Sequence, residues 1–203
     1  VFLRPLGLRL DDTCLGILIA FHTGIRLGEL CALTWECIDL EESVLSIKRS
    51  MQRTSGKIEA GKTEIVLQEP KSLTSLRSIP LPPVLLPFLK QYRQPDPCYV
   101  IRGKKKPFAE PRTVQYRFSK ILKQCQCEDF HFHMLRHAFA TRCIDMGFDV
   151  KSLSEILGHS NVQITMNLYV HSTMQRKKQL MNLFTAKPPE EMQYPPLSYN
   201  TSE

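Results

Sequence analysis

The order of helix and strand signals along the chain constrains its fold more than any other feature. Three short segments with β-strand character follow one another in the middle of the sequence: residues 44–50, 63–68 and 77–81. Pro80, Pro82 and Pro83 end the last of them. Helical patterns come before and after this region. We therefore expect a mainly α fold, of the α+β class, with one small antiparallel sheet over residues 44–81.

Capping residues and glycines mark the helix boundaries. Asp11 or Asp12 is suited to begin a helix that Gly24 ends, and Asp149 to begin a short helix that Gly158 ends. Further helices are expected after Arg26, at about 84–93, from Thr113 to Gln124, at 133–146 before Gly147, and from Ser160 toward Tyr169.

Length and composition favour one domain. The chain has 203 residues, 42% of them hydrophobic, which is enough for one sizeable core. We expect this domain to span residues 1–186, with an amphipathic segment at 173–184. Residues 187–203 are proline-rich and polar, so a disordered tail is expected there. Because the chain starts at Val1 and not at Met, we interpret it as a part of a longer protein.

Charge and cysteine usage limit the environment and the partner. The formal net charge of +7 and the pI near 9.1 favour a polyanionic partner. The seven cysteines form no paired framework, which favours reduced thiols in a cytoplasmic protein. Neither a signal peptide nor an apolar run near the ~20 residues of a membrane span is visible, so no membrane partner is expected.

The side chains suited to chemistry are concentrated in residues 131–170. This stretch contains His133, Arg136, His137, His159 and Tyr169, and the upstream segment TGIRLGE at 23–29 supplies Arg26. A guanidinium group presents a planar fork that forms paired, charge-assisted hydrogen bonds with phosphate oxygens. Two arginines can therefore hold a phosphodiester while a tyrosine oxygen attacks it.

These motifs resemble the catalytic domain of the tyrosine recombinases, the phage integrase family. The matching segments are TGIRLGEL at 23–30, HMLRHAFAT at 133–141, LGHSNVQIT at 157–165, and Tyr169. Within the family the chain most resembles integrases of phages and conjugative transposons. The resemblance implies a site-specific DNA recombinase that works through a 3′-phosphotyrosyl bond and a Holliday junction, without a cofactor or metal ion.

The resemblance also implies roles for individual residues. Tyr169 would be the nucleophile, Arg26 and Arg136 would hold the non-bridging phosphate oxygens, and His133 would accept the tyrosine proton. His159 would donate a hydrogen bond to a phosphate oxygen. Thr165 and Asn161 are further possible phosphate contacts.

Three more positions complete the expected site. Lys71 would protonate the leaving 5′-oxygen, because it precedes the RSIPL strand as the family lysine does; Lys57 and Lys62 are its rivals. Glu29 lies about one helical turn after Arg26 and is expected to orient its guanidinium group. His137 is expected to have a structural or supporting role.

The expected partner is double-stranded DNA. Two groups of basic residues could contact it, or could equally be solvated charges: Arg102, Lys104, Lys105 and Lys106 in one loop, and Arg53 and Lys57 in a hairpin. The resemblance further implies a homotetramer on DNA, in which residues 173–184 pack on a neighbouring protomer or, alternatively, on their own core. It also implies preceding DNA-binding domains and allows accessory DNA-bending proteins.

Three other interpretations remain to be weighed. A type IB topoisomerase uses related tyrosine chemistry but relaxes supercoils, and a catalytically silent DNA-binding protein would keep the fold alone. His133 and His137 are spaced like a zinc pair, but the HExxH pattern needs a glutamate where this chain has Met134, so no metal site is expected.

Overall fold

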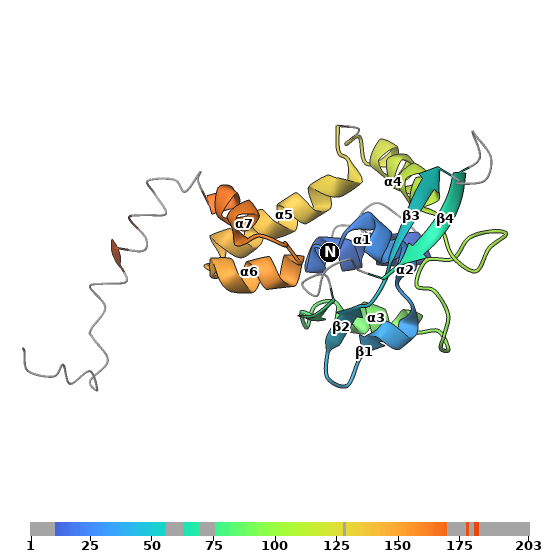
Figure 1. Cartoon of the computed structure of the whole chain (residues 1–203), viewed down its shortest axis with the longest axis horizontal. Coiled ribbons are helices and arrows are strands. Elements are labelled where there is room, and N and C mark those ends of the chain that lie inside the picture. Colours follow the sequence, from blue (N-terminus) through green and yellow to red (C-terminus); the bar gives the residue numbers. More distant parts are fainter. Residues whose placement is uncertain are drawn as a thin grey trace, which may run out of the picture. The chain divides into compact units, whose positions relative to one another are not determined.

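In the computed structural model, residues 11–55, 63–69, 76–127 and 129–169, together with 178, 181 and 182, are described (Figure 1). The chain divides into two compact units, residues 1–168 and 169–203, and the fold below is that of the first. Lys57, Lys62, Lys71, most of the 173–184 segment and the expected tail at 187–203 lie outside the described residues.

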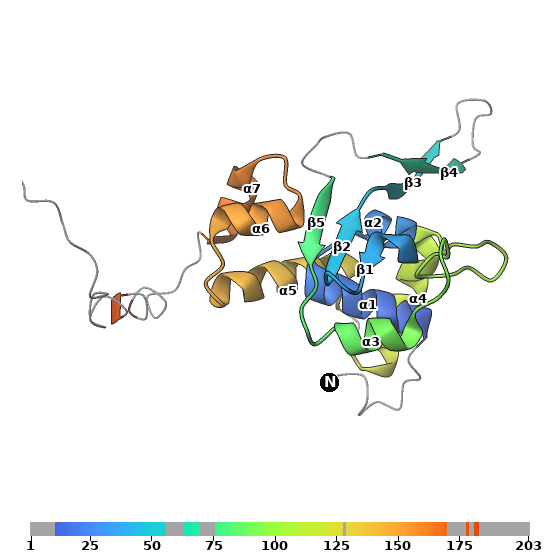
Figure 2. The ribbon, with the colours of Figure 1, turned by 90° about the horizontal axis from the view of Figure 1, so that it is seen from below.

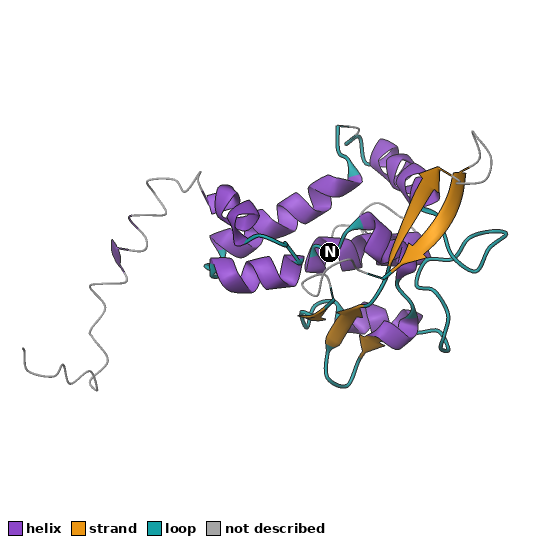
Figure 3. Cartoon of the chain, viewed as in Figure 1, coloured by secondary structure: helices purple, strands orange, loops and turns teal. Residues whose placement is uncertain are grey.

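Helices are the predominant regular elements of the described structure, as expected for a mainly α fold (Figures 1 and 3). In chain order the elements are α1 (Asp12–Thr23), α2 (Leu27–Ala32), a 3-10 helix (Trp35–Cys37), β1 (Ile38–Asp39), β2 (Val44–Ile47), β3 (Ser50–Ser55), β4 (Thr63–Gln68), β5 (Arg77–Pro80), α3 (Leu86–Tyr92), α4 (Pro111–Gln124), α5 (Phe132–Asp145), α6 (Val150–Leu157) and α7 (Val162–Tyr169).

The strands form two antiparallel sheets, so the prediction of a single sheet over residues 44–81 was wrong. One sheet has the order β1-β2-β5, with Leu45 paired to both Ile38 and Ile79. The other is the hairpin β3-β4, which Figure 2 shows beside the first. The expected strand at 44–50 ends at Ile47, because the chain leaves the first sheet at residues 48–49 and starts β3 at Ser50.

The core lies around α1, which contacts α2, α3, α4 and α5 (Figure 2). Helices and both β-sheets contribute buried apolar side chains to this core, among them Leu15, Ile19, Leu30, Trp35, Leu45, Met51, Ile79, Leu89, Val114 and Phe132. Burying such side chains is the main favourable term in folding. None of the described helices is long and apolar enough to cross a membrane.

Most of the predicted helix boundaries are confirmed by capping contacts. The Asp11 side chain accepts a hydrogen bond from the Cys14 amide at 2.8 Å, and Asp149 accepts one from Ser152 at 2.9 Å. Gly24 ends α1 in the left-handed conformation at φ 66°, where a glycine has no steric penalty.

Two predicted helix starts were wrong. Helix α4 begins at Pro111, and Thr113 lies inside it, because proline at the first helical position needs no amide hydrogen bond. Helix α7 begins at Val162, and Asn161 rather than Ser160 caps it, by accepting a hydrogen bond from the Gln163 amide at 2.8 Å.

Candidate active site

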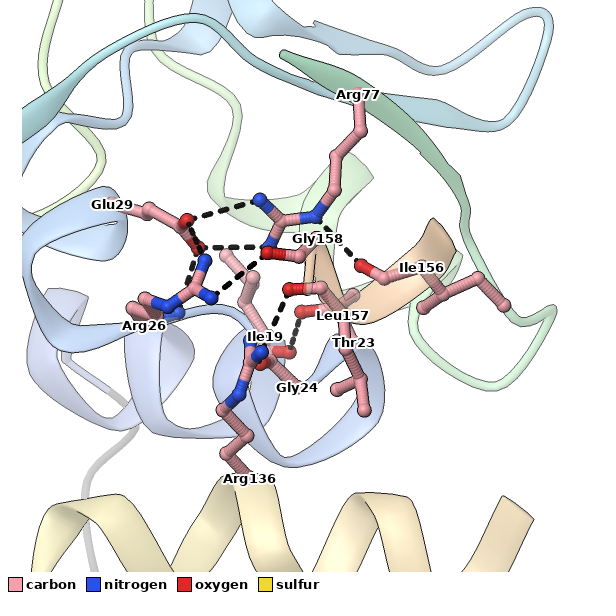
Figure 4. Close-up of polar contacts among 10 residues, drawn as sticks. All are labelled: Ile19, Thr23, Gly24, Arg26, Glu29, Arg77, Arg136, Ile156, Leu157 and Gly158. Carbon is pink, nitrogen blue, oxygen red and sulfur yellow. Dashed lines mark hydrogen bonds and ion pairs between the residues drawn. The ribbon is translucent and has the colours of Figure 1, made fainter. Parts of the chain in front are cut away.

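Three arginine side chains converge on the carboxyl end of α6 (Figure 4). Each donates a hydrogen bond to a different main-chain carbonyl: Arg77 Nε to Ile156 at 2.6 Å, Arg136 Nη2 to Leu157 at 2.7 Å, and Arg26 Nη2 to Gly158 at 2.9 Å. The last carbonyls of a helix lack intrahelical partners and carry the negative end of its dipole. This helix end is therefore a suitable anchor for cations, and we call Arg26, Arg77 and Arg136 the arginine cluster.

Glu29 is the carboxylate at the centre of this cluster, and its side chain is 5% exposed. Arg77 binds both of its oxygens, at 2.9 Å each. Arg26 donates to the same two oxygens, from Nη1 at 3.0 Å and from its main-chain amide at 2.8 Å. Burial would raise the pKa of Glu29, but the hydrogen bonds and charges of Arg77 and Arg26 outweigh it and hold the pKa below its usual value. The geometry fits the orienting role expected for Glu29.

Arg136 is buried among neutral acceptors. It is 6% exposed and donates to the carbonyls of Gly24 and Leu157, each at 2.7 Å. Burial first, and then the charge of Arg26, lower the pKa of Arg136 to about 9, which leaves it protonated at neutral pH. Glu29 forms salt bridges with Arg26 and Arg77, whereas Arg136 forms none with any described residue. Because buried charge is costly without a counter-charge, the charge of Arg136 favours binding of an anion.

The glycines of the two motifs have a specific role in this geometry. Gly24 ends α1 and presents its carbonyl to Arg136, while Gly158 ends α6 at φ 64° and presents its carbonyl to Arg26. A Cβ atom at Gly158 would lie 2.8 Å from Arg77 Nη1. The helix end can therefore approach the arginine cluster closely only with glycine at this position.

His159 directly follows this helix end. Its Nδ1 atom lies 2.8 Å from the hydroxyl of Thr165, which is fully buried. Burial and then the charges of the arginine cluster lower the pKa of His159 to about 4, so its ring is neutral at pH 7. Thr165, expected as a possible phosphate contact, instead holds His159, and Asn161 caps α7.

His133 lies in the first turn of α5, with its ring edge-on to that of His137 and 5.0 Å from it. Burial, followed by the charges of His137 and Arg136, lowers the pKa of His133. In the part of the chain that the structure describes, no three His, Cys, Asp or Glu side chains are grouped in a way that could hold a metal ion.

A cleft of about 270 Å³ brings several of these residues together. Its lining comprises Ile25, Arg26, Leu27, Gln115, His131, Phe132, His133 and Arg136. Three residues predicted for the site, Arg26, His133 and Arg136, thus face one cavity although they are far apart in the sequence. The cleft is an open, cationic pocket of a size that can admit a phosphate group.

Sequence reasoning did not identify Arg77 as a site residue. It was interpreted only as part of the RSIPL strand, and its partner Glu29 lies 48 positions away, so no local pattern links the two. Tyr169 is the last residue of α7, but its side chain, like Lys71, lies outside the described part of the structure.

The basic residues expected to contact DNA lie in two neighbouring elements. Arg53 of β3 and Lys106 both form ion pairs with Glu110, the latter at 2.7 Å. Arg102, Lys104 and Lys105 are exposed. The carboxylate of Glu110 thus ties the hairpin to the basic loop.

The chain belongs to the phage integrase family, whose model matches residues 7–176. It is 32% identical over 178 residues to the tyrosine recombinase XerC-like protein of Caldanaerobacter subterraneus subsp. tengcongensis, covering 79% of this chain and 46% of that protein. It is 31% identical over 169 residues to the tyrosine recombinase XerA of Pyrococcus furiosus, covering 80% of this chain and 51% of that protein. The chain thus spans about half the length of these curated relatives.

Solved structures show the same fold. The Tn1549 transposon integrase in complex with circular intermediate DNA superposes with a TM-score of 0.72 at 23% identity, over 90% of this chain and 63% of that one. The XerA recombinase superposes with a TM-score of 0.56 at 22% identity, over 89% of this chain and 65% of that one. The family resemblance and the fold class expected from the motifs are therefore confirmed.

Proposed function

We propose that this chain is the catalytic part of a site-specific DNA recombinase or integrase that cleaves and rejoins strands through Tyr169. The observation that carries the proposal is the arginine cluster at the end of α6, in which three guanidinium groups meet at consecutive carbonyls and Arg136 is buried among neutral acceptors. A phosphodiester gains negative charge as it approaches the pentacoordinate transition state, and fixed cationic donors stabilise that charge. Names of curated relatives as tyrosine recombinases add support.

In the proposed reaction the oxygen of Tyr169 attacks phosphorus and the bond to the 5′-oxygen breaks. A phenol has an ordinary pKa of about 10, so its proton needs an acceptor. The lowered pKa of His133 favours the neutral ring that can accept it. Lys71 would give a proton to the leaving 5′-oxygen. A 5′-hydroxyl from a partner strand then reverses the step, and exchange of both strand pairs passes through a Holliday junction.

Arg26 and Arg136 would hold the non-bridging oxygens in this reaction, and neutral His159 would donate a hydrogen bond to one of them. The partial exposure of Arg26, whose side chain is 41% accessible, supports direct contact with a phosphate. His137, which lies against His133, would tune that histidine through its charge. The proposed steps use only side chains of this chain.

Double-stranded DNA is the proposed partner. Arg102, Lys104 and Lys105, with Arg53, Lys57 and Lys106, would contact phosphates outside the cleft. A homotetramer on DNA, packing of residues 173–184 on a neighbouring protomer, preceding DNA-binding domains and accessory bending proteins all belong to the proposal. The proposed location is the cytoplasm, in association with the bacterial nucleoid when the protein is on DNA.

The test uses a suicide DNA substrate whose nick traps the covalent intermediate. The wild-type protein should form a protein–DNA adduct, and Tyr169→Phe should bind the same DNA but form none, because phenylalanine lacks the attacking oxygen. Tyr116→Phe is the matched control, since Tyr116 is an exposed residue of α4, and it should still form the adduct.

Each outcome separates the alternatives. An adduct with Tyr169→Phe would refute the nucleophile, and no adduct with the wild type on cognate DNA would indicate a silent DNA-binding protein. Relaxation of a supercoiled plasmid without joining of paired sites would indicate a topoisomerase.

A further inference from the structure

We propose that Arg77 is a positioning residue of the active site, which holds Glu29 and the end of α6 so that Arg26 and His159 are correctly placed. This inference rests on the proposed function, because it concerns the same phosphate site. Arg77 is the first residue of β5, and the sequence motifs assign it no role beyond the start of the RSIPL strand.

The contacts of Arg77 join three elements (Figure 4). From β5 its Nη1 and Nη2 atoms bind the two carboxylate oxygens of Glu29 on α2, each at 2.9 Å. Its Nε atom donates to the carbonyl of Ile156 on α6 at 2.6 Å. The planar guanidinium group of Arg77 therefore fixes α2 relative to α6.

The burial of Arg77 distinguishes it from a residue that touches the substrate. Its side chain is 6% exposed, whereas that of Arg26 is 41% exposed. The guanidinium group of Arg26 is held by Glu29 and by the carbonyl of Gly158, and Arg77 contacts or borders both. Arg77 thus acts on the substrate through Arg26 and not directly.

A lysine at position 77 cannot reproduce the contacts of Arg77. A guanidinium group has its donors in a rigid fork that matches a carboxylate, whereas an ammonium group is a compact point charge. The flat guanidinium of Arg77 also fits against Gly158, where even a methyl group would come within 2.8 Å of Nη1. Arg77→Lys should therefore keep the positive charge but lose the paired hydrogen bonds with Glu29.

The test compares the rate of adduct formation on the suicide substrate for the wild type, Arg77→Gln, Arg77→Lys and a control, Arg93→Gln. Arg93 makes the same kinds of contact, binding both oxygens of Asp96 and the main-chain carbonyl of Trp35, but lies outside the arginine cluster. Both Arg77 variants should cleave about 10- to 100-fold more slowly, because misplaced catalytic groups cost rate. Their DNA affinity should stay within about threefold of the wild type, since phosphate contacts outside the cleft supply most of it.

The pH profile of cleavage separates positioning from a merely structural role. The pKa of Glu29 is held low in the wild type, so its carboxylate is lost only as the pH falls through that low value. Arg77→Gln removes the hydrogen bonds and the charge of Arg77 that oppose the effect of burial, and the pKa of Glu29 rises. Cleavage should then begin to fall at a higher pH than in the wild type, as Glu29 becomes protonated and releases Arg26.

Other charged groups near Glu29 are unchanged in this comparison. Arg136 acts on it through charge, and Glu36, Lys48 and Arg49 line a small pocket beside it. The double variant Arg77→Gln/Glu29→Gln lacks the titrating carboxylate. The fall of its cleavage rate at low pH should therefore occur at the same pH as in Glu29→Gln.

The outcomes are distinguishable from failure of the proposed function. If the wild type forms no adduct, the proposed function itself fails. If the wild type forms the adduct and both Arg77 variants match Arg93→Gln after correction for the folded fraction, the inference is overturned. Should Arg77→Gln fail to fold, Arg77→Lys decides the question: wild-type cleavage by it would overturn the inference, and slow cleavage with intact DNA binding would support it.

Discussion

His159 is held through its Nδ1 atom by the hydroxyl of Thr165, and no described residue forms a hydrogen bond with its Nε2 atom. When the hydroxyl donates to Nδ1, the ring proton of the neutral histidine must lie on Nε2. That nitrogen can then donate to a phosphate oxygen, which is an acceptor. The fully buried threonine would thus select the tautomer that the proposed chemistry needs.

Thr165→Val removes this hydroxyl and keeps the shape of the side chain. Cleavage should slow about 10- to 100-fold, as is usual when a group that orients a functional histidine is lost, whereas Thr165→Ser should keep most of the rate. Single-turnover cleavage measures the rate, and nitrogen-15 NMR of the His159 ring reports the tautomer. A wild-type rate in Thr165→Val, or a proton on Nδ1 in the wild type, would contradict this role.

The contact between Arg26 and Glu29 could be predicted from local spacing. The two residues lie three positions apart at the start of one short helix, and the structure places them in contact at 3.0 Å. Arg77 was missed because its partners come from α2 and α6, and neither is near it in sequence. The contact of Thr165 with His159 was not predicted, because a sequence motif does not show which side of a helix is covered.

At the scale of elements, the end of α6 is the structure on which the site depends. Three consecutive carbonyls there accept hydrogen bonds from the arginine cluster. The left-handed glycine that closes the helix leaves these carbonyls open to the arginines. A small change at this helix end should therefore affect catalysis more than stability.

Gly158→Ala tests this expectation. A side chain in the left-handed region costs about 1–2 kcal/mol, and its Cβ would also displace Arg77, so cleavage should fall beyond the loss of folded protein. Gly147→Ala is the control, because Gly147 also has positive φ, at 88°, but follows the C-cap of α5, outside the arginine cluster. Thermal unfolding should show similar losses for both variants; equal cleavage by the two folded proteins would contradict the expectation.

The bounds and pairing of the β-strands could not be predicted fully from the sequence. The strand at 44–50 had only partial alternation, and the polar residues Gln52, Arg53 and Thr54 gave no strand signal. Yet β3 pairs with β4 over its whole length, from Ser50 with Gln68 to Ser55 with Thr63. Partner strands and packing against α2 and α4, rather than local pattern, determine this hairpin.

At the scale of the whole molecule, Glu110 limits the positive charge that is available to the proposed DNA partner. It binds Lys106 in the basic loop and Arg53 on β3, and the hydrogen bonds and charges of these two residues lower its pKa. It thereby joins the two regions that were expected separately as DNA contacts. The chain has a formal net charge of +7, and Glu110 offsets part of the positive charge in these two regions.

Glu110→Gln should free both cations for phosphate contacts. DNA binding at low salt should tighten, and the dependence of log K on log salt should steepen by up to about 0.9 for each phosphate gained. Glu41→Gln is the control, since it makes the same charge change on an exposed turn between β1 and β2. Titrations at several salt concentrations measure the slope, and identical slopes for the two variants would refute this role of Glu110.

The meeting of three distant chain segments at one helix end also has a consequence during synthesis. Arg26 leaves the ribosome early, Arg77 later, and Arg136 and the carbonyls of residues 156–158 last. A nascent or truncated product that stops before α6 lacks the common anchor for all three. The proposed phosphate site can therefore form only after residues 156–158 have been synthesised.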